Sequence, residues 1–256
     1  MSEIEVRERI LITGASGGFG YEFARQLEQT GAQLVLHGRD EARLQLTLDG
    51  LKYPDRHQCI LADLSQRKSV ETFIETLSEQ GVITGLVNNA GFGVWGEFER
   101  CESVAQLDVL RTDLVAPVAI AHALLPELIR QHGFMINVSS LAGESPLPYM
   151  STYAAAKAGM TYWSEALRAE LEGKLTIVTL VPGPSPTGFR DVSGAPKGKG
   201  SFFRASADEV VAESLTMLRR GGGYCVPGFR HRMLWLLQKL VPRQVVLKLM
   251  SKYLKP

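Results

Sequence analysis

The stretch Thr13-Gly14-Ala15-Ser16-Gly17-Gly18-Phe19-Gly20 lies between a short apolar run, Ile10–Ile12, and a helical pattern that begins at Tyr21. Three of its glycines have the spacing G-x-x-x-G-x-G. Glycine lets the backbone approach a pyrophosphate closely, and the N-terminus of a helix favours the negative charge of that group. A strand, a glycine-rich turn and a helix in this order predict an α/β unit with a pyrophosphate-binding loop.

Short apolar runs alternate with helix-length segments along the rest of the chain. The expected strands are Ile10–Ile12, Leu34–Leu36, Ile60–Ala62, Leu86–Val87, Met135–Val138, Ile177–Val181 and Tyr224–Val226. The expected helices include Tyr21–Thr30, Ser65–Gln80, Gln106–Arg130, Thr152–Glu172 and Ala207–Arg219. Most of the strand runs lack polar alternation, as expected when both faces of a sheet are covered. The pattern therefore predicts an α/β fold with a doubly wound parallel sheet of about seven strands and helices on both faces.

The sheet pattern stops near Gly228 and is followed by a C-terminal tail. We expect residues 1–228 to form one dinucleotide-binding catalytic domain and residues 229–256 to form a basic amphipathic helical tail, packed on the same domain or on a partner. The tail is predicted to be two helical stretches around Pro242. Every charged residue after Glu213 is Lys or Arg. Two interpretations stay open: the tail helices close a pocket or pack on a partner subunit, or they present a surface to an anionic membrane.

Composition excludes several classes of function. The formal net charge of +1 over 256 residues indicates no nucleic acid or other polyanionic partner. The cysteines and histidines show no metal-ligand spacing, so we expect no metal site, and the five histidines are expected to be surface or hydrogen-bonded core residues. The charged N-terminus predicts no signal peptide, and no apolar run is expected to span a bilayer. These features predict a cytoplasmic protein, with peripheral membrane contact as the alternative.

The second expected strand ends in His37-Gly38-Arg39. Dinucleotide-binding folds that take NAD usually place an acidic residue here, where it binds the ribose 2′-hydroxyl. A carboxylate would repel a 2′-phosphate, whereas Arg39 can pair with it. The sequence therefore favours NADP(H) over NAD(H), and the alternative is that Arg39 is a solvated loop cation.

Tyr153 and Lys157 are four residues apart in a helical pattern, which puts both side chains on one face. The phenol of tyrosine has a pKa of about 10, too high for efficient proton exchange near neutrality. A nearby ammonium favours the phenolate and lowers that pKa. The pair is a candidate acid–base couple, although this spacing also occurs by chance on many helices.

Further polar motifs follow the other expected strands. They are Asp63-Leu64 after the third, Asn88-Asn89-Ala90-Gly91 after the fourth, Ser139-Ser140 after the fifth and Pro182-Gly183, with Thr187, after the sixth. Ligands bind at the carboxyl ends of the strands in open α/β sheets. We therefore expect these motifs to meet around one site.

This constellation resembles the short-chain dehydrogenase/reductase family, in its single-domain branch, from about Arg9 to Gly228. The resemblance implies a Rossmann-like carbonyl reductase or alcohol dehydrogenase in which Tyr153 exchanges the proton of the substrate oxygen. It also implies that Lys157 lowers the pKa of Tyr153, that Ser140 hydrogen-bonds the reacting oxygen, and that the protein is a homodimer or homotetramer. The cofactor contacts that it implies are Gly14, Ser16, Gly17, Gly18, Phe19, Gly20, Arg39, Asp63, Leu64, Asn89, Ala90, Gly91, Tyr153, Lys157, Pro182, Gly183 and Thr187.

One catalytic position departs from the family pattern. The family usually has Asn in the helix after the fourth strand, where it anchors a water in the proton relay, and here that position is Asp113. Part of that role depends on a main-chain carbonyl, which survives. Asp accepts hydrogen bonds but cannot donate like an amide. We expect activity to persist with an altered relay.

Apolar residues near these motifs predict the substrate pocket. The candidates are Leu141, Tyr149, Trp95 and Phe189, and the last lies with Phe202 and Phe203 in the long segment Pro182–Ser206, expected to form a loop over the site. The alternative is that these residues pack in the core or an interface. A second functional hypothesis is an NADPH-sensing protein with little turnover, favoured only by Asp113. A third, a sugar-nucleotide epimerase or dehydratase, would need another glycine spacing and a larger C-terminal domain.

Overall fold

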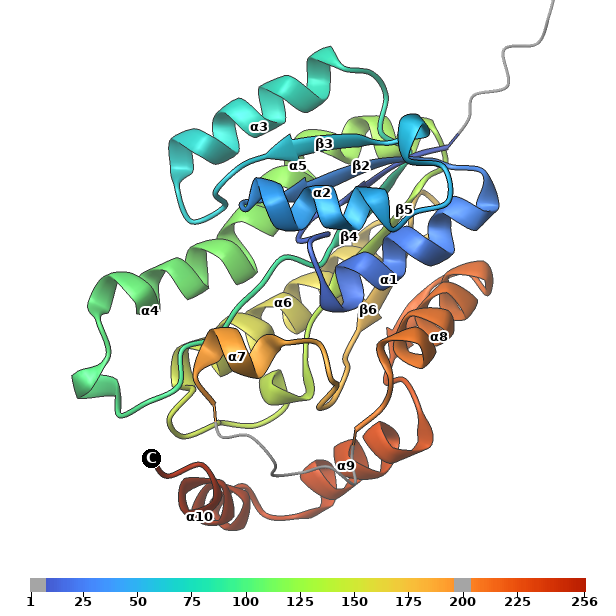
Figure 1. Cartoon of the computed structure of the whole chain (residues 1–256). Coiled ribbons are helices and arrows are strands. Elements are labelled where there is room, and N and C mark those ends of the chain that lie inside the picture. Colours follow the sequence, from blue (N-terminus) through green and yellow to red (C-terminus); the bar gives the residue numbers. More distant parts are fainter. Residues whose placement is uncertain (1–7, 196–203) are drawn as a thin grey trace, which may run out of the picture.

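The fold is organised around one parallel sheet of seven strands in a computed structural model that describes residues 8–195 and 204–256 (Figure 1). The strands are β1 (Arg9–Ile12), β2 (Gln33–Gly38), β3 (Gln58–Leu61), β4 (Gly85–Asn88), β5 (Phe134–Val138), β6 (Thr176–Leu180) and β7 (Gly223–Cys225). Their order is β3-β2-β1-β4-β5-β6-β7, and all neighbouring pairs are parallel. The chain reverses its direction of travel across the sheet between β1 and β4, so a ligand crevice is expected at the carboxyl ends of these two strands. The doubly wound, seven-stranded fold with a helical tail is confirmed.

Ten α-helices connect and follow the strands in the part of the chain that the structure describes. They are α1 (Gly18–Leu27), α2 (Glu41–Asp49), α3 (Arg67–Glu79), α4 (Ser103–Leu110), α5 (Ala116–Arg130), α6 (Ser151–Glu170), α7 (Phe189–Ser193), α8 (Ala207–Arg219), α9 (Phe229–Leu240) and α10 (Arg243–Tyr253). A π-helical segment, Arg111–Val115, joins α4 to α5. Such segments often occur at functional sites, and this one contains Asp113.

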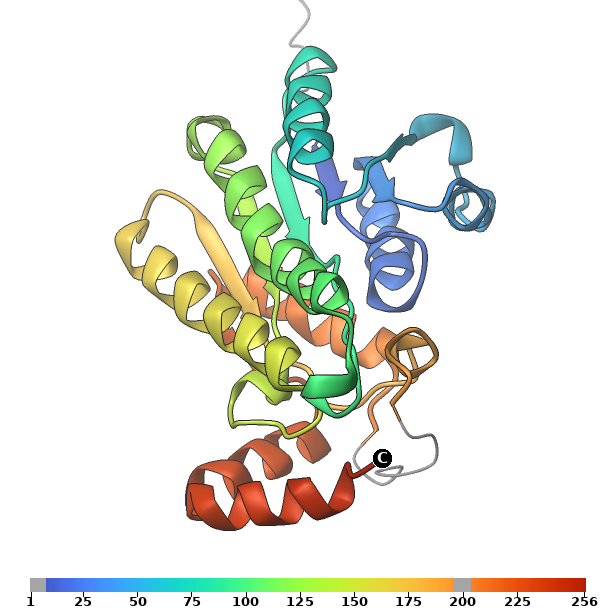
Figure 2. The ribbon, with the colours of Figure 1, turned by 90° about the vertical axis from the view of Figure 1, so that its left-hand side faces the viewer.

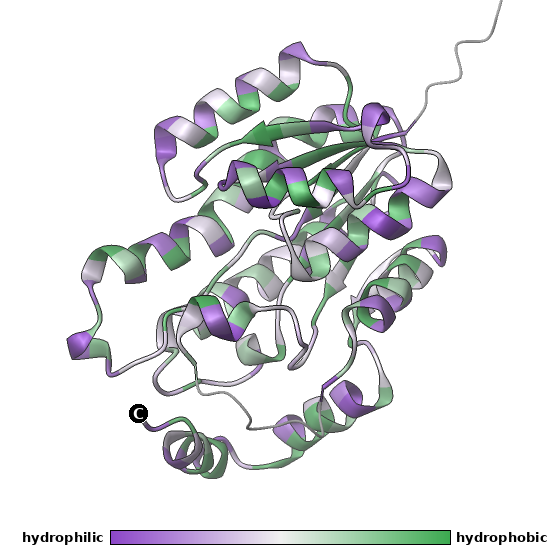
Figure 3. Cartoon of the chain, in the orientation of Figure 1, coloured by the Kyte–Doolittle hydropathy of each residue, from purple (hydrophilic) through white to green (hydrophobic). Residues whose placement is uncertain are grey.

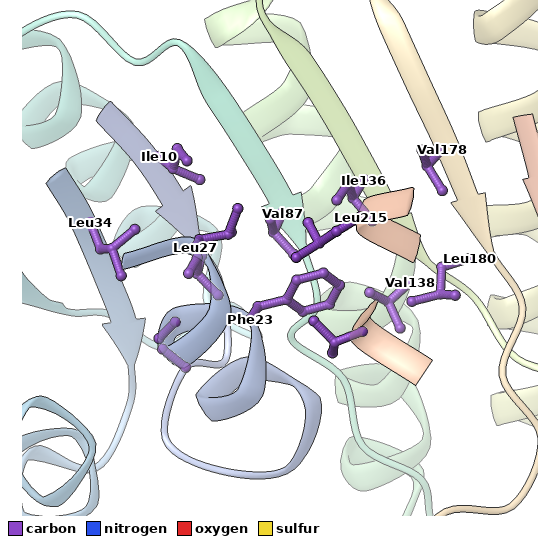
Figure 4. Packing of buried hydrophobic residues seen from close by; sticks show 14 of the residues in the cluster. Ile10, Phe23, Leu27, Leu34, Val87, Ile136, Val138, Val178, Leu180 and Leu215 are labelled. Atoms are coloured by element: carbon purple, nitrogen blue, oxygen red, sulfur yellow. The ribbon is translucent and has the colours of Figure 1, made fainter. Parts of the chain in front are cut away.

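Both faces of the sheet are covered, which explains the uninterrupted apolar runs. Successive residues of a strand point to opposite faces, so Ile10 and Ile12 pack in one core cluster and Leu11 in the other. On the first face, Phe23 and Leu27 of α1 lie against β1, β2, β4, β5 and β6 (Figure 4). The second face is covered by α3, α5 and α6 (Figure 2).

One continuous helical span, Ser103–Arg130, is long and apolar enough by length and composition to cross a membrane. The expectation that no segment reaches this length was therefore wrong. Its inner residues, which include Ile120, Leu124 and Leu128, are buried in the core beside the sheet. A core helix passes the same test, so the finding is weak support for a membrane span.

The tail helices α9 and α10 lie at one end of the molecule, below the carboxyl ends of the strands in Figure 1 and again at the bottom in Figure 2. They pack on the same chain. Trp235 of α9 donates its indole N–H to Glu144 (3.1 Å), and Trp95 donates its indole N–H to the carbonyl of Leu254, just after α10 (2.9 Å). These contacts hold the tail beside the segment that follows β5 and the segment that follows β4.

Candidate active site and cofactor cleft

A cavity of about 850 Å³ lies over the carboxyl ends of the strands. The candidate residues that line it are Gly14, Ser16, Gly17, Gly18, Phe19, Arg39, Asp63, Leu64, Asn89, Ala90, Gly91, Ser140, Leu141, Tyr153, Lys157, Pro182, Gly183, Thr187 and Phe189. Four other candidates, Gly20, Asp113, Trp95 and Tyr149, lie outside its lining. The structure thus brings the strand-end motifs together in one place.

The glycine-rich loop depends on the absence of side chains. A Cβ on Gly20 would lie 2.1 Å from the carbonyl oxygen of Gly14, and a Cβ on Gly14 would lie 2.7 Å from Cα of Ala90. Gly20 is therefore a packing residue beneath the loop. The helix N-cap, Gly17, makes no side-chain capping bond, so the first N–H groups of α1 are available to an anion.

The loop after β4 is tied to this glycine loop by Thr13 and Asn89. The hydroxyl of Thr13 accepts from the backbone N–H of Asn89 (3.0 Å) and of Ala90 (3.1 Å). The side-chain amide of Asn89 donates to the carbonyl oxygens of Thr13 and Gly14, each at 3.0 Å. Asn89 therefore shapes the cleft through the backbone as well as lining it.

Two buried histidines hold cofactor-loop backbone, a role that sequence reasoning missed. Nδ1 of His37 accepts from the N–H of Gly14 (3.2 Å), and its Nε2 then donates to Ala62 O (3.1 Å). Burial lowers the pKa of His37 to about 4, which keeps this neutral tautomer at neutral pH. Nδ1 of His231 accepts from the N–H of Gly183 (3.1 Å). The position of His37 next to Gly38 was a usable signal, whereas nothing in the sequence indicated His231.

Two guanidinium groups border the cavity just beyond β2. Arg39 lies 5.8 Å from the ring centroid of Phe92, and Arg43 donates to the carbonyl oxygen of Ser16 (3.3 Å). Arg43 was missed because the short helix α2 has weak periodicity. The sequence signal that could have indicated this helix, and with it Arg43, was Asp40, whose carboxylate caps α2 by accepting from the backbone N–H of Arg43 (3.0 Å). The two cations fit a site for a phosphate on the ribose.

The helix that carries Tyr153 and Lys157 is fixed closely against the end of β5. The hydroxyl of Ser139 donates to the carbonyl of Lys157 (2.8 Å), and the lysine Nζ donates to the carbonyl of Val138 (3.0 Å). That Nζ lies 5.9 Å from the ring centroid of Tyr153, whose phenol hydrogen-bonds Ser140. The three candidate catalytic side chains therefore occupy one wall of the cavity.

Asp113 is fully buried directly behind this wall. One carboxylate oxygen accepts from the backbone N–H of Phe92 (2.9 Å), and the other lies 3.2 Å from Nζ of Lys157. A Cβ on Gly91 would lie 2.7 Å from that second oxygen, so glycine makes the approach possible. Burial raises the pKa of Asp113, while the charge of Lys157 and the N–H of Phe92 oppose the rise.

The pKa of Tyr153 differs in direction from the sequence-based expectation. Burial raises it, the negative charge of Asp113 raises it further, and the hydrogen bond with Ser140 opposes the rise. Lys157 does not lower the pKa of Tyr153 as expected, because the carboxylate of Asp113, 3.2 Å from the lysine Nζ, balances the charge of the lysine. The phenol is therefore held in its protonated form around neutral pH.

The outer part of the cavity is apolar. Phe189 lies with its ring centroid 5.0 Å from that of Tyr153, and Leu141 also lines the cavity. Trp95 binds the tail through its indole N–H, and the carbonyl of Tyr149 accepts from the N–H of Gly96 (2.9 Å), so both support the site from outside its lining. Further lining comes from the tail: Leu234, Leu237, Gln238, Val241, Val246, Leu249, Met250, Tyr253 and Leu254.

The long segment after β6 contains the short helix α7 and contributes several lining residues. The candidates Phe202 and Phe203 lie outside the described residues. Residues of the tail help to close the cavity, which agrees with the interpretation that the tail helices close a pocket or pack on a partner subunit.

Comparison with known proteins gives a family match over most of the chain. Residues 8–197 match the short chain dehydrogenase family model. The chain is 37% identical over 179 residues to 11-beta-hydroxysteroid dehydrogenase-like 4A of Arabidopsis thaliana, an alignment that covers 68% of this chain and 60% of that protein. It is 34% identical over 227 residues to dehydrogenase/reductase SDR family member 7B of Xenopus laevis, covering 83% of this chain and 70% of that protein. The chain thus spans only about three-fifths of the length of the first of these relatives.

Solved structures agree in fold over nearly the whole chain. A short-chain dehydrogenase from Sphingobium yanoikuyae in complex with NADPH has a TM-score of 0.81 and 25% identity, covering 95% of both chains. The bulky-bulky ketone specific alcohol dehydrogenase from Comamonas testosteroni has a TM-score of 0.76 and 26% identity, covering 95% of this chain and 94% of that one. A Burkholderia phymatum member in complex with NAD shares the fold at a TM-score of 0.80 and 22% identity.

Proposed function

The chain belongs to the short-chain dehydrogenase/reductase family, and on that basis we propose that it interconverts a ketone or aldehyde and an alcohol with NADP(H), on a bulky apolar substrate. One observation carries the proposal. Ser140, Tyr153 and Lys157 line the same cavity as the glycine-rich loop, and the outer part of that cavity is apolar. The names of a hydroxysteroid dehydrogenase-like relative and a bulky-ketone dehydrogenase neighbour support this substrate class.

The residues of the cleft fit a nicotinamide dinucleotide. The glycine cradle and the N-terminus of α1 suit a pyrophosphate, and Arg39 with Arg43 suits a ribose phosphate. When bound, the reduced cofactor supplies the hydride. Pro182, Gly183 and Thr187 would hold its nicotinamide end, and Lys157 would bind the adjoining ribose.

The chain's own residues provide the proton chemistry. Ser140 and Tyr153 would donate hydrogen bonds to the substrate oxygen and stabilise the negative charge that develops on it. Tyr153 would then deliver its proton to that oxygen; its raised pKa keeps the phenol protonated at neutral pH but also makes it a weaker acid. In the oxidative direction Tyr153 must first lose this proton, and the same raised pKa opposes that loss.

A panel of ketones, aldehydes and alcohols, assayed with NADPH and with NADH, tests the proposed function. We expect multiple turnovers with bulky apolar ketones and a preference for NADPH. Cofactor binding without turnover on any member of the panel would favour the NADPH-sensing alternative. Of the site residues only Asp113 favours that alternative, and the presence of Ser140, Tyr153 and Lys157 together in the cavity lining argues against it.

Arg39→Ala is expected to weaken NADPH binding roughly 10- to 100-fold and to change NADH binding little, because a charge-assisted bond of about 1.5–3 kcal/mol is lost only with the phosphorylated cofactor. Dissociation constants from fluorescence titration would measure both. Arg56→Ala, at a cation outside the cavity, is the matched control. An equal loss for both cofactors would remove Arg39 as the source of selectivity.

Asp113→Asn is expected to shift the activity profile to lower pH, because it removes a negative charge that raises the pKa of Tyr153. Reduction needs the protonated phenol and should decline at a lower pH than in the wild type. Alcohol oxidation needs the phenolate and should rise at a lower pH. The profiles of kcat/KM in both directions measure the shift.

Asp108→Asn, at a partly buried aspartate outside the cavity that pairs with Arg111 at 2.8 Å, is the control for the Asp113 variant. It should leave both profiles in place. A loss of rate in Asp113→Asn with unmoved profiles would mean that Asp113 only supports the fold around Lys157.

We further propose a homodimer or homotetramer in the cytoplasm, with the tail available for peripheral membrane contact. A cluster of exposed apolar residues supports self-association: Val104, Leu107, Val115 and Tyr162 are 64%, 45%, 58% and 78% exposed. They belong to α4, the π-helical segment and α6, which lie side by side in Figure 2. Sedimentation velocity of the wild type and of Val104→Glu/Leu107→Glu would test this surface.

A further inference from the structure

We propose that the outer face of α9 and α10 docks on an anionic lipid bilayer, and that the cavity takes up its lipophilic carbonyl substrate through that face. The uptake step rests on the proposed function. The docking step does not, because it stands on the surface alone.

The first observation is that α9 turns an apolar stripe toward solvent. Phe229, Leu236 and Leu240 are 78%, 50% and 79% exposed. They are spaced i, i+7 and i+11, which places them on one side of a helix. The opposite side of α9 faces the protein, where His231 is buried and Trp235 bonds Glu144. The stripe is therefore additional to the apolar contacts that hold the helix in place.

The second helix repeats the pattern. Val245 and Leu249 of α10 are 46% and 57% exposed and four residues apart, while Val246 is buried against the protein. The two stripes belong to neighbouring helices at the same end of the molecule (Figures 1 and 2). Figure 3 shows green apolar segments alternating with purple polar ones along both helices.

The tail that contains these stripes also carries exposed cations, and no acidic residue follows Glu213 in the sequence. The exposed cations are Arg230, Arg232, Lys239, Arg243, Lys248, Lys252 and Lys255. Arg232 pairs with Glu213 and Lys239 with Glu144. Within the described chain, Arg243, Lys248, Lys252 and Lys255 have no ion-pair partner. Exposed apolar residues between cations match the interface of an anionic bilayer, where the apolar groups insert and the cations meet lipid phosphates.

The charge pattern argues against a second copy of the chain as the occupant. A two-fold contact places the same patch of both subunits face to face. Here that contact would bring Lys and Arg of one copy against Lys and Arg of the other, while the neighbouring carboxylates of Glu213 and Glu144 already pair with Arg232 and Lys239 of their own copy. Anionic lipid supplies the negative charge that a contact between two such patches would lack.

The third observation links this face to the cavity. Leu237, Leu249 and Tyr253 are 46%, 57% and 37% exposed, and all three also line the cavity. They therefore form its rim on the outer side of the tail. A bilayer against this rim would meet an apolar passage that leads to Phe189 and Tyr153.

Co-sedimentation with vesicles tests the docking step. The full chain should bind vesicles of phosphatidylcholine with phosphatidylserine, bind phosphatidylcholine alone weakly, and be released by high salt. Leu236→Glu/Leu240→Glu should bind roughly tenfold more weakly, since it puts charge into the apolar stripe. Lys248→Gln/Lys252→Gln should weaken binding only to the anionic vesicles. None of these four residues lines the cavity.

Two matched controls separate docking from general effects of charge. Leu46→Glu alters a leucine that is 71% exposed on α2, and Lys68→Gln alters an exposed lysine on α3. Both should bind like the wild type. Equal sedimentation of wild type and tail variants would overturn the proposal. So would tail-dependent dimers in sedimentation velocity without vesicle binding, which would identify a second copy as the occupant.

The uptake step is tested with one water-soluble ketone and one ketone embedded in the vesicles. The tail variants should keep the wild-type rate on the soluble ketone and lose about tenfold on the embedded one. Equal rates of all variants on the embedded ketone would overturn uptake through this face. If no variant turns over the soluble ketone, the proposed function fails, while the vesicle-binding result still decides docking.

Discussion

Tyr153→Phe is expected to lower kcat/KM about 10³-fold while NADPH binds within a few-fold of the wild-type affinity, since general acid–base catalysis typically contributes 10²–10⁴-fold. Phenylalanine keeps the ring that packs 5.0 Å from Phe189 and removes only the group that exchanges the proton. The missing hydroxyl also removes one hydrogen bond with Ser140, a loss of about 1 kcal/mol that should leave the protein folded. Steady-state kinetics and a fluorescence titration with NADPH give the two readouts.

Tyr162→Phe is the matched control, because Tyr162 lies on the same helix and is 78% exposed. It should keep wild-type turnover and melting temperature. Full turnover in Tyr153→Phe would overturn the assignment of the proton donor. Loss of NADPH binding in Tyr153→Phe, with an unchanged melting temperature, would instead place the phenol in cofactor binding.

The fold could be predicted because its signals are local and repeated. Each strand run has its apolar residues on both faces, and α8 was predicted with the bounds that the structure has. The start of α3 was predicted at Ser65, but the helix begins at Arg67, because Asp63 accepts from the N–H of Ser65 in a turn before it. The helix α2 was missed, since only Leu44 and Thr47 are buried and the apolar periodicity is weak.

The residues of the site could be predicted from the sequence more fully than the contacts between those residues. Ser140, Tyr153 and Lys157 could be chosen because each follows a strand or shares a helix face. That Asp113 pairs with Lys157 could not, because the contact joins a π-helical segment to α6 across the turn of Gly91. The support that His231 gives to Gly183 spans 48 positions and depends on where the tail packs. Contacts of this kind arise from tertiary packing and leave no spacing in the sequence.

Lys157→Met is expected to lower the free energy of unfolding by about 3–5 kcal/mol at neutral pH, because it leaves Asp113 as an uncompensated buried charge. In the wild type the second oxygen of Asp113 has Lys157 at 3.2 Å and makes no hydrogen bond in the described structure. Methionine fills much of the lysine volume, so a cavity contributes little. Chemical denaturation measures the loss, and Lys174→Met, at an exposed lysine just beyond α6, should show none.

The pH dependence identifies the cause of that loss. Burial already raises the pKa of Asp113 in the wild type, and removing Lys157 raises it further in the folded state. A group whose folded-state pKa lies above its unfolded value stabilises the fold below the unfolded pKa, and this stability is lost as pH rises through the folded pKa. The Lys157→Met variant should therefore lose stability more steeply than the wild type as the pH rises above the unfolded-state pKa of an aspartate, about 4.

The double variant Lys157→Met/Asp113→Leu separates charge from packing. It removes both charges from the buried site, and replacing a buried ion pair by apolar residues is often neutral or stabilising. Most of the stability lost in Lys157→Met should return, and the steep pH dependence should disappear, while turnover stays absent because the lysine is gone. If the double variant is no more stable than Lys157→Met, the unpaired carboxylate is not the main cause, and the loss comes from the hydrogen bonds that the double variant lacks, those of Lys157 to the carbonyl of Val138 and of the Phe92 N–H to Asp113.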